Sequence, residues 1–406
     1  MLTPILAFLF FLFPKGRLYL SERLGIWPLR VLEDAIVLHG ASLGEVQGLM
    51  PLAKKLRDIY KGCSIIITTT SPTGRACGEK NSFRTFLLPF DWEPLLINAL
   101  SSLNIKLFVI SETEIWPGLI YTLQKLNITW IIINGRISDK SWDFYKAFAA
   151  LLRPLLKNAD KILVADEVSV GRFSDLCLKN DSIKLVGNTK YDFVSLVTSD
   201  SEAQKIKKNY FNADLPVLTL GSLRPGEEKF WLSAIVEILS KSKNSLRVVL
   251  APRHPEKFEY FAEILRNENL EFTRRTTQKS ASAEPILLLD TLGELSKVYA
   301  FSNFSFIGGS IEAYGGHNPL EAMIYGCPIA MGSSVYTVQD IVSKLKEMDG
   351  IITIDSVEDC NRVISILVDQ PEKLSYLKEC SLKVTKHFQG ATAAVLAEIE
   401  ELIGGT

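Results

Sequence analysis

Short apolar runs alternate with helix-forming stretches along the first half of the chain. The apolar runs cover residues 35–38, 64–69, 85–88, 106–110, 129–134 and 161–164. Between them, polar and apolar residues recur with helical spacing, as at 48–60 and 116–126. Uninterrupted apolar strands separated by helices are typical of a parallel sheet that is buried on both faces. We therefore predict a doubly wound α/β domain over residues 25–192.

The same pattern restarts after a polar, helical stretch at residues 193–214, which we interpret as a linker. The later apolar runs cover residues 217–220, 247–251, 285–289, 304–307 and 328–331. They predict a second parallel α/β domain over residues 215–385. The remaining residues, 386–406, contain a final helix from about 391 to 403 that could pack back on the first domain.

Composition narrows the class of protein. The chain has 406 residues, of which 47% are hydrophobic, enough for two domain cores. Its net charge of −1 argues against non-specific nucleic-acid binding. The six cysteines show no CxxC spacing and the four histidines are not paired, so neither a disulfide framework nor a zinc site is expected. A reducing, cytoplasmic setting fits best.

The N-terminus is apolar from Leu2 to Phe13 and is followed by Lys15, Arg17 and Arg23. This run is shorter than the roughly 20 residues that span a bilayer. No positive residue precedes it and no small-residue cleavage site follows it, which disfavours a signal peptide. We expect residues 1–24 to associate with a membrane face, with the basic side chains at the headgroups. The alternative is a helix packed on the protein.

The stretch 306–321 carries the strongest chemical signal. It leaves a buried strand, passes through two glycine pairs and enters a helix, with Asn318 as the expected N-cap and Pro319 as the first helical residue. Backbone N–H groups beside glycines, together with a helix N-terminus, predict a seat for an anion such as phosphate. Glu321 could accept hydrogen bonds from ribose hydroxyls. The alternative is a tightly packed strand–helix joint.

Polar residues also follow the strands of the first domain. Glu45 lies at the start of a helix after the loop 39–44, where its carboxylate could act as a general base or merely complement the helix dipole. Glu112 belongs to a stretch that suggests a shaped pocket, or only helix capping. Arg136 follows a further strand, and Lys190 lies in the stretch that closes the domain. Both could meet an anion at the same edge of the sheet, although a solvated surface cation is the usual role of either residue alone.

In the second domain, Arg253 follows Pro252 at a strand end and is placed to meet a phosphate. The loop 290–295 could present backbone groups to a base, unless Asp290 simply caps a helix there. The chain has no GxGxxG motif and no P-loop, which disfavours a dehydrogenase or an ATPase. It also has no Asp-x-Asp at a strand end of this domain, so a metal-held diphosphate is not supported.

A collinear set of motifs, extending from about Leu18 to the last helix, resembles the 3-deoxy-D-manno-octulosonic acid (Kdo) transferases of lipopolysaccharide synthesis. The motifs are His39–Glu45, Thr68–Arg75, Leu88–Asp91, Glu112–Pro117, Asn134–Ser138, Gly187–Asp192, Gly226–Glu228, Pro252–Pro255, Asp290–Leu295 and Gly308–Glu321. The resemblance implies a GT-B glycosyltransferase, an α/β protein with two Rossmann-like domains facing across a cleft. It implies CMP-Kdo as donor, a lipid A precursor (lipid IVA) as acceptor, and the cytoplasmic face of the inner membrane as location.

The resemblance also assigns roles to residues. Glu45 matches the general base, and Glu112 and Lys190 match groups that support the transition state. The residues that match CMP contacts, or lie beside them in the glycine loop, are Pro252, Arg253, Leu292, Gly293, Glu294, Gly308, Gly309, Ser310, Asn318, Pro319, Leu320 and Glu321. We assign Ser42, Gly44 and Arg136 to the acceptor or to the Kdo carboxylate. The expected reaction is an inverting displacement without a metal or another cofactor.

The chain departs from the family pattern at three places. Leu43 replaces a usual Val, Arg224 lies where a Thr-His-like pair is common, and Ser333-Ser334 replaces a frequent Pro-His. Two alternatives therefore stay open: a GT-B transferase that uses another nucleotide-sugar, and a catalytically silent nucleotide-binding relative. The presence of Glu45, Arg253 and Glu321 argues against the silent relative.

Overall fold

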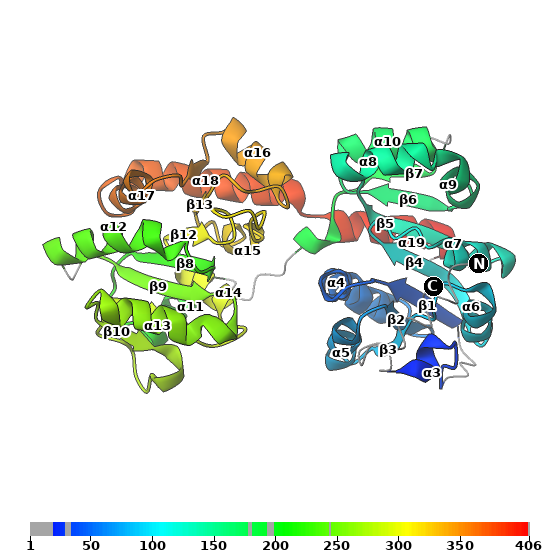
Figure 1. Cartoon of the computed structure of the whole chain (residues 1–406), viewed down its shortest axis with the longest axis horizontal. Coiled ribbons are helices and arrows are strands. Elements are labelled where there is room, and N and C mark those ends of the chain that lie inside the picture. The colour runs from blue at the N-terminus through cyan, green and yellow to red at the C-terminus, as the bar shows by residue number, and fades with distance from the viewer. Residues whose placement is uncertain (1–18, 29–33, 178–180, 193–198, 243–244, 405–406) are drawn as a thin grey trace. The chain divides into compact units, whose positions relative to one another are not determined.

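The computed structural model describes residues 19–28, 34–177, 181–192, 199–242 and 245–404. The chain divides into two compact units (Figure 1). The first unit comprises residues 1–192 together with 388–406, and the second comprises residues 193–387. Each unit is built around a parallel seven-stranded sheet.

The sheet of the first unit has the order β3-β2-β1-β4-β5-β6-β7. Its strands are β1 (Asp34–His39), β2 (Ser64–Thr69), β3 (Arg84–Leu87), β4 (Asn104–Ser111), β5 (Trp130–Gly135), β6 (Lys161–Val164) and β7 (Ile183–Leu185). The order reverses between the neighbouring strands β1 and β4, which pair in parallel. In open α/β sheets such a switch point is where ligands bind, beyond the carboxyl ends of the strands.

Helices cover both faces of this sheet. They are α4 (Leu43–Ile59), α5 (Pro72–Lys80), α6 (Glu93–Leu100), α7 (Pro117–Lys125), α8 (Asp139–Ala147), α9 (Ala149–Leu156), α10 (Glu167–Cys177) and α19 (Ala391–Ile403). Val37 of β1 joins a core with residues of α6, α7 and α10, whereas its neighbours Ile36 and Leu38 join a second core with α4 and α19. Because successive side chains point to opposite faces, burial of both faces explains the uninterrupted apolar strands.

The second unit repeats this plan with the strand order β10-β11-β9-β8-β12-β13-β14. Its strands are β8 (Val217–Leu223), β9 (Arg247–Pro252), β10 (Phe272–Arg274), β11 (Ile286–Leu288), β12 (Phe304–Ile307), β13 (Ile329–Met331) and β14 (Ile351–Thr353). Its helices include α11 (Asp200–Tyr210), α12 (Glu228–Lys241), α13 (Phe258–Asn267), α14 (Leu295–Phe301), α15 (Leu320–Met323), α16 (Gln339–Glu347), α17 (Val357–Asp369) and α18 (Pro371–Phe388). The switch point lies between β8 and β12.

Two segments at the ends of the second domain differ from the predicted linker and tail in the unit to which they belong. The stretch 193–214 contains α11, which belongs to the second unit because Tyr210 packs on Phe301 of α14, with ring centroids 5.2 Å apart. The final helix α19, red in Figure 1, lies on the sheet of the first unit, where Val395 and Ile399 are fully buried. The chain therefore returns to its first unit after completing the second.

The predicted membrane segment Leu2–Phe13 lies outside the described residues. Just beyond it, a short helix α3 (Leu20–Arg23) packs on the first unit. Arg23 is buried and donates to the carbonyl of Thr70. The expectation that its side chain meets a lipid headgroup is therefore wrong. Among the residues that the structure describes, no helix has the length and apolarity needed to cross a bilayer.

Candidate functional site

Glu45 lies in the first turn of α4, directly after β1 at the switch point of the first sheet. Its carboxylate accepts hydrogen bonds from the backbone N–H of Ala41 (2.8 Å) and from the hydroxyl of Ser42 (2.6 Å). Ser42 in turn caps the helix by accepting from the Glu45 N–H. Glu45 is buried, so this carboxylate is both a helix-capping group and a preorganised acceptor at the strand edge.

Glu112 and Lys190 form an ion pair within the first unit. Glu112 follows β4 with a left-handed backbone (φ 63°). Lys190 lies on the short 3-10 helix η1 (Thr189–Tyr191), which is fixed by buried Asn134: Asn134 donates to the Thr189 hydroxyl (2.9 Å) and accepts from its N–H (2.8 Å). The predicted free cation at Lys190 is therefore already paired with a carboxylate of the same unit.

Gly48 brings this ion pair next to the helix that carries Glu45. It lies one turn after Glu45 in α4, and the aliphatic part of Lys190 runs across it. A Cβ at Gly48 would be 2.5 Å from Cγ of Lys190, which is too close for a van der Waals contact. The absence of a side chain at Gly48 thus allows Lys190 to lie on α4, which is a role that the sequence alone did not reveal.

A third carboxyl group, Glu114, completes the cluster. It accepts a hydrogen bond from the indole N–H of Trp116 (2.8 Å). Burial raises the pKa of Glu114, and the nearby charges of Glu45 and Glu112 raise it further. Glu114 follows β4 two residues after Glu112, so a carboxyl group that favours a bound proton lies in the same loop as the Glu112–Lys190 ion pair.

The residues assigned to the acceptor or the Kdo carboxylate have less distinctive surroundings. Ser42 and Gly44 are exposed at the first turn of α4. Arg136 follows β5 and pairs with Asp166 at 3.5 Å. Its assignment to an anionic ligand stays a prediction, because this guanidinium already has an acidic partner.

In the second unit, the glycine loop after β12 does form an anion seat, but a protein carboxylate occupies it. Glu227 is fully buried and accepts from the backbone N–H groups of Gly309 and Ser310, each at 3.0 Å, and of Ile311 at 3.2 Å. It also accepts from the N–H of Arg224 at 2.9 Å. The prediction that these N–H groups hold a ligand phosphate is therefore corrected: their charge complement is supplied by the chain itself.

The glycine pairs serve close packing and backbone conformation. A Cβ at Gly308 would be 2.4 Å from the carbonyl oxygen of Ser222, and Gly309 has φ 72°. The helix that follows, α15, begins at Leu320 and is a single turn, with Pro319 rather than Asn318 at the N-cap position. The Asn318 side chain accepts from the Leu320 N–H at 3.0 Å. So short a helix contributes little dipole to an anion site.

Two arginines and a histidine gather at the ends of β8 and β9 instead. Arg224 follows β8, Arg253 follows β9, and His317 lies in the loop before α15. Burial, together with the charges of Arg253, Arg224 and His254, lowers the pKa of His317 to about 4. Burial raises the pKa of Glu321, an effect that Arg253 opposes. Arg253 lies beside Arg224 at the strand ends, because its backbone N–H donates to the carbonyl of Leu223 at 3.0 Å.

The loop 290–295 is held by its own side chains. Glu294 accepts from Arg275, from the hydroxyl of Tyr210 (3.0 Å) and from that of Thr291 (2.5 Å). Asp290 accepts from the N–H of Thr276 and does not cap a helix, because α14 begins at Leu295. The exposed tip comprises Leu292, which is 72% exposed, and Gly293, with φ 82°. Any contact from this loop to a base would therefore come from its backbone, while the Glu294 carboxylate holds the loop in place.

The departure at Ser333-Ser334 also has a structural role. The hydroxyl of Ser334 accepts from the N–H of Gly315 at 3.2 Å, and its backbone N–H donates to the carbonyl of Ser310 at 2.8 Å. Ser334 therefore ties the segment after β13 to the loop that carries His317.

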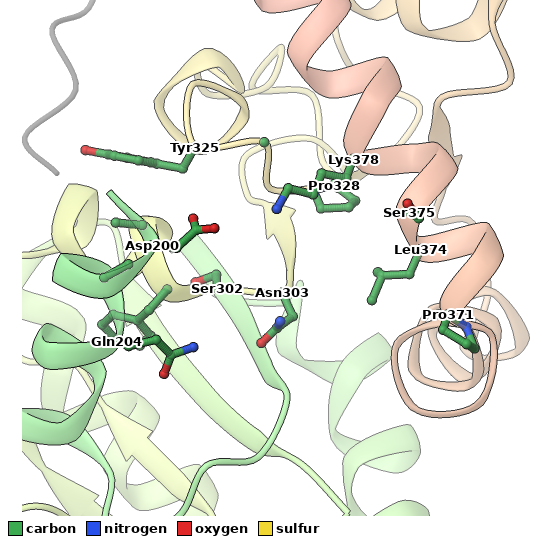
Figure 2. A pocket seen from close by; sticks show the side chains of 14 residues that line it. Asp200, Gln204, Ser302, Asn303, Tyr325, Pro328, Pro371, Leu374, Ser375 and Lys378 are labelled. Atoms are coloured by element: carbon green, nitrogen blue, oxygen red, sulfur yellow. The ribbon is translucent and has the colours of Figure 1, made fainter. Parts of the chain in front are cut away.

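A cavity of about 390 Å³ lies elsewhere in the second unit, between α11 and α18 (Figure 2). Ser302, Asn303 and Pro328 line it just before β12 and β13, so it is at the amino ends of these strands. It contains none of the predicted site residues. Within the described ranges, no group of three or more His, Cys, Asp or Glu side chains is arranged to hold a metal ion.

Comparisons with known proteins point to the same family of transferases that the motifs resemble. A family model described as "3-Deoxy-D-manno-octulosonic-acid transferase (kdotransferase)" matches residues 19–193. A 3-deoxy-D-manno-octulosonic acid transferase of Haemophilus influenzae is 31% identical over 393 residues, which cover 94% of this chain and 91% of that protein. A transferase of the same name from Chlamydophila psittaci is 27% identical and covers 82% of this chain and 77% of its own length.

Solved structures extend the likeness to the whole architecture. The crystal structure of a glycosyltransferase from Rickettsia africae matches with a TM-score of 0.58 and 13% identity, over 93% of this chain and 100% of that one. At this identity the likeness concerns the fold alone. With the two parallel seven-stranded sheets, it identifies the architecture as GT-B.

Proposed function

This chain belongs to the family of Kdo transferases, and we propose that it moves Kdo from CMP-Kdo to a hydroxyl of a lipid A precursor, lipid IVA, in lipopolysaccharide core synthesis. It is a glycosyltransferase with the GT-B fold. The donor, the acceptor and the inverting, metal-independent course of the reaction are parts of the proposal.

One observation carries the proposal: the predicted catalytic residues gather at the switch point of the first sheet. Glu112 pairs with Lys190, and Lys190 lies across Gly48 on the helix that carries Glu45. These residues are far apart in the sequence and were assigned from separate motifs. Their convergence at the carboxyl edge of the sheet is what a reaction centre requires.

In the proposed reaction the acceptor hydroxyl oxygen attacks the anomeric carbon of Kdo. Its proton passes to the carboxylate of Glu45, and the bond from the anomeric carbon to the phosphate oxygen breaks, leaving the electron pair on CMP. Arg253 stabilises the charge on the departing phosphate, so no metal is needed for this step. The ion pair of Glu112 and Lys190 supports the transition state.

The location follows from the acceptor. A lipid substrate has to be reached at a membrane, and we place the enzyme at the cytoplasmic face of the inner membrane. The apolar sequence Leu2–Phe13 and the family of the chain support this placement. Flotation of the protein with vesicles of bacterial lipid, with and without residues 1–18, tests it: loss of flotation on truncation is expected.

The decisive experiment is a transfer assay. CMP-Kdo is generated in situ, a tetra-acylated lipid A precursor is supplied, and the product mass is read with and without a chelator. We expect a gain of one or more Kdo masses that the chelator does not reduce, and the mass also counts the units added.

Other results point to the alternatives. No mass gain, with CMP binding intact, indicates a silent relative. A gain only from a UDP-sugar indicates a GT-B transferase with another donor, and loss of transfer with the chelator contradicts the metal-independent mechanism.

A further inference from the structure

The side chain of Arg224, at the end of β8, is held by contacts with two rings. Its guanidinium lies 4.0 Å from the centroid of the Tyr314 ring, and its Nε donates to Nε2 of His317 at 3.4 Å. Its backbone N–H is bound by Glu227. In the described part of the chain, no carboxylate is within ion-pairing distance of the Arg224 guanidinium, and its terminal amino groups make no hydrogen bond. A guanidinium fixed in this way is prepared for an anionic ligand.

The residues around Arg224 indicate which part of a bound donor would reach it. Glu321, the predicted ribose-binding residue, is coupled electrostatically to Arg253. The backbone N–H of Arg253 donates to the carbonyl of Leu223 at 3.0 Å, and Leu223 of β8 pairs with Pro252 of β9. Arg224 and Arg253 therefore follow neighbouring strand ends, and His317 contacts Arg224. If the nucleoside lies at Glu321 and the phosphate at Arg253, the sugar part of the donor extends toward Arg224.

The proposed donor carries a second anion at the corresponding place. In a CMP-linked 2-keto sugar acid, the anomeric carbon bears both the phosphate ester and a carboxylate. Two negative groups are thus separated by only a few bonds, and a site for this molecule needs two positive groups close together. A UDP-hexose also carries two negative groups, but both belong to its diphosphate and neither is a carboxylate on the anomeric carbon.

We propose that Arg224, oriented by Tyr314 and His317, binds the anomeric carboxylate of the donor sugar and selects 2-keto sugar acids as donors, while Arg253 binds the phosphate. This inference rests on the proposed function. Gly309 is part of the subsite, because a Cβ there would be 2.9 Å from Cδ2 of His317 and 3.6 Å from Nε of Arg224. The departure from the family pattern at Arg224 supplies the planar, two-pronged donor group that suits a carboxylate.

The test compares Arg224→Gln with Arg253→Gln. CMP has no carboxylate and CMP-Kdo has one, so the dissociation constant of CMP is measured by calorimetry and the KM of CMP-Kdo in the transfer assay. We expect Arg224→Gln to raise the KM of CMP-Kdo about tenfold or more and to change CMP affinity by less than about twofold. Arg253→Gln should weaken both. Arg266→Gln, at an exposed arginine of α13, is the matched control and should change neither.

Three results overturn the inference. Equal weakening of CMP and CMP-Kdo by Arg224→Gln would move Arg224 to the phosphate. Unchanged binding of both would remove it from the site. Failure of the wild-type protein to transfer Kdo, or to bind CMP, would refute the proposed function and this inference with it. The second result, obtained with a wild-type protein that transfers Kdo, refutes the inference alone.

Discussion

Glu227 shows at the level of a single residue what a glycine-rich sequence can and cannot predict. The glycines after β12 were expected to expose N–H groups to an anion, and the structure has such groups in that place. The occupant is a buried carboxylate that lies 82 residues earlier in the chain. Backbone conformation can be inferred from local sequence, but a long-range partner with the same chemistry as a ligand cannot.

The buried carboxylate of Glu227 should be essential for the stability of the second unit. In the wild type, four backbone N–H groups donate to the two carboxylate oxygens of Glu227. In Glu227→Gln only one oxygen is left to accept them, and the amide NH₂ faces other hydrogen-bond donors. We expect a loss of about 2–4 kcal/mol in the free energy of unfolding, measured by urea denaturation. Glu256→Gln, at an exposed carboxylate, is the control. Losses of the same size in both variants would contradict the assigned role.

Glu45 has two possible roles, which one variant can separate. Glu45→Gln keeps an oxygen that can accept from Ala41, so most of the capping interaction is retained, but the amide cannot take a proton. We expect the kcat for Kdo transfer to fall at least 100-fold while CMP affinity and thermal stability change little.

The control for Glu45→Gln is Ser356→Ala, which removes a capping box from α17 in the second unit. It should cost about 1 kcal/mol of stability and leave kcat unchanged. Near-normal kcat in Glu45→Gln would rule out Glu45 as the base and leave only its capping role.

His39 should make the stability of the protein sensitive to acid. It is fully buried at the end of β1, with Nδ1 3.0 Å from the hydroxyl of Thr68, and burial lowers its pKa from 6.5 to about 4. Between pH 6.5 and 4 the unfolded chain binds a proton that the folded chain does not, so the free energy of unfolding falls as the pH falls. The full effect is about 3 kcal/mol.

Comparing the wild type with His39→Gln isolates this contribution. The difference between their unfolding free energies, measured by urea denaturation from pH 7 to pH 4, should shrink with falling pH. His387→Gln, at an exposed histidine, should show a constant difference from the wild type. A constant difference for His39→Gln as well would mean that the imidazole has the same pKa in the folded and the unfolded chain, and it would contradict the prediction.

At the level of elements, helix α4 holds the proposed reaction centre through both its capping turn and a glycine. Gly48→Ala should favour the helix by up to about 1 kcal/mol on propensity alone. The new methyl group, however, displaces the Lys190 side chain, because it would lie 2.5 Å from Cγ. We expect kcat to fall about tenfold or more without a loss of thermal stability.

The matched control is Gly171→Ala in α10, where a Cβ would meet nothing within 4 Å. It should stabilise the protein without changing kcat. If Gly48→Ala retained full activity, the position of Lys190 on α4 would not matter for transfer.

The elements that could not be predicted share a physical property. The strands of the sheet interiors were predicted because burial on both faces requires continuous apolar residues. The strands β7, β10 and β14 were missed: each has only three residues, lies at an edge of its sheet and is only partly buried. Helical spacing could be seen only from residue 48, whereas α4 begins at Leu43, because Gly44 is a poor helix former and weakens the local signal in the first turn.

At the level of the whole molecule, the GT-B architecture and the family could be predicted from the order of motifs along the chain. The predicted catalytic residues come together in the first unit, but the pairing of Lys190 with Glu112 and the role of Gly48 could not be anticipated. Both depend on η1 lying against α4, which is a tertiary contact without a local sequence pattern. The binding of Glu227 to the N–H groups after β12 could not be predicted for the same reason, because it too is a tertiary contact without a local sequence pattern.

The return of the chain to its first unit predicts that the C-terminal helix stabilises the reaction centre. Ile399 of α19 is fully buried among residues of α4 and the sheet, and Glu398 binds Lys184 (2.8 Å) and Lys161 (3.0 Å). Ile399→Ala should lower the free energy of unfolding of the first unit by about 2–4 kcal/mol. The same substitution at the half-buried Ile403 should lower it less. Hydrogen exchange resolves the two units: amides of β1 and α4 should exchange faster in Ile399→Ala, and those of β8 and β12 should not change. Uniformly faster exchange would instead mean that the two units unfold together, and that the helix stabilises the whole chain rather than the unit on which it packs.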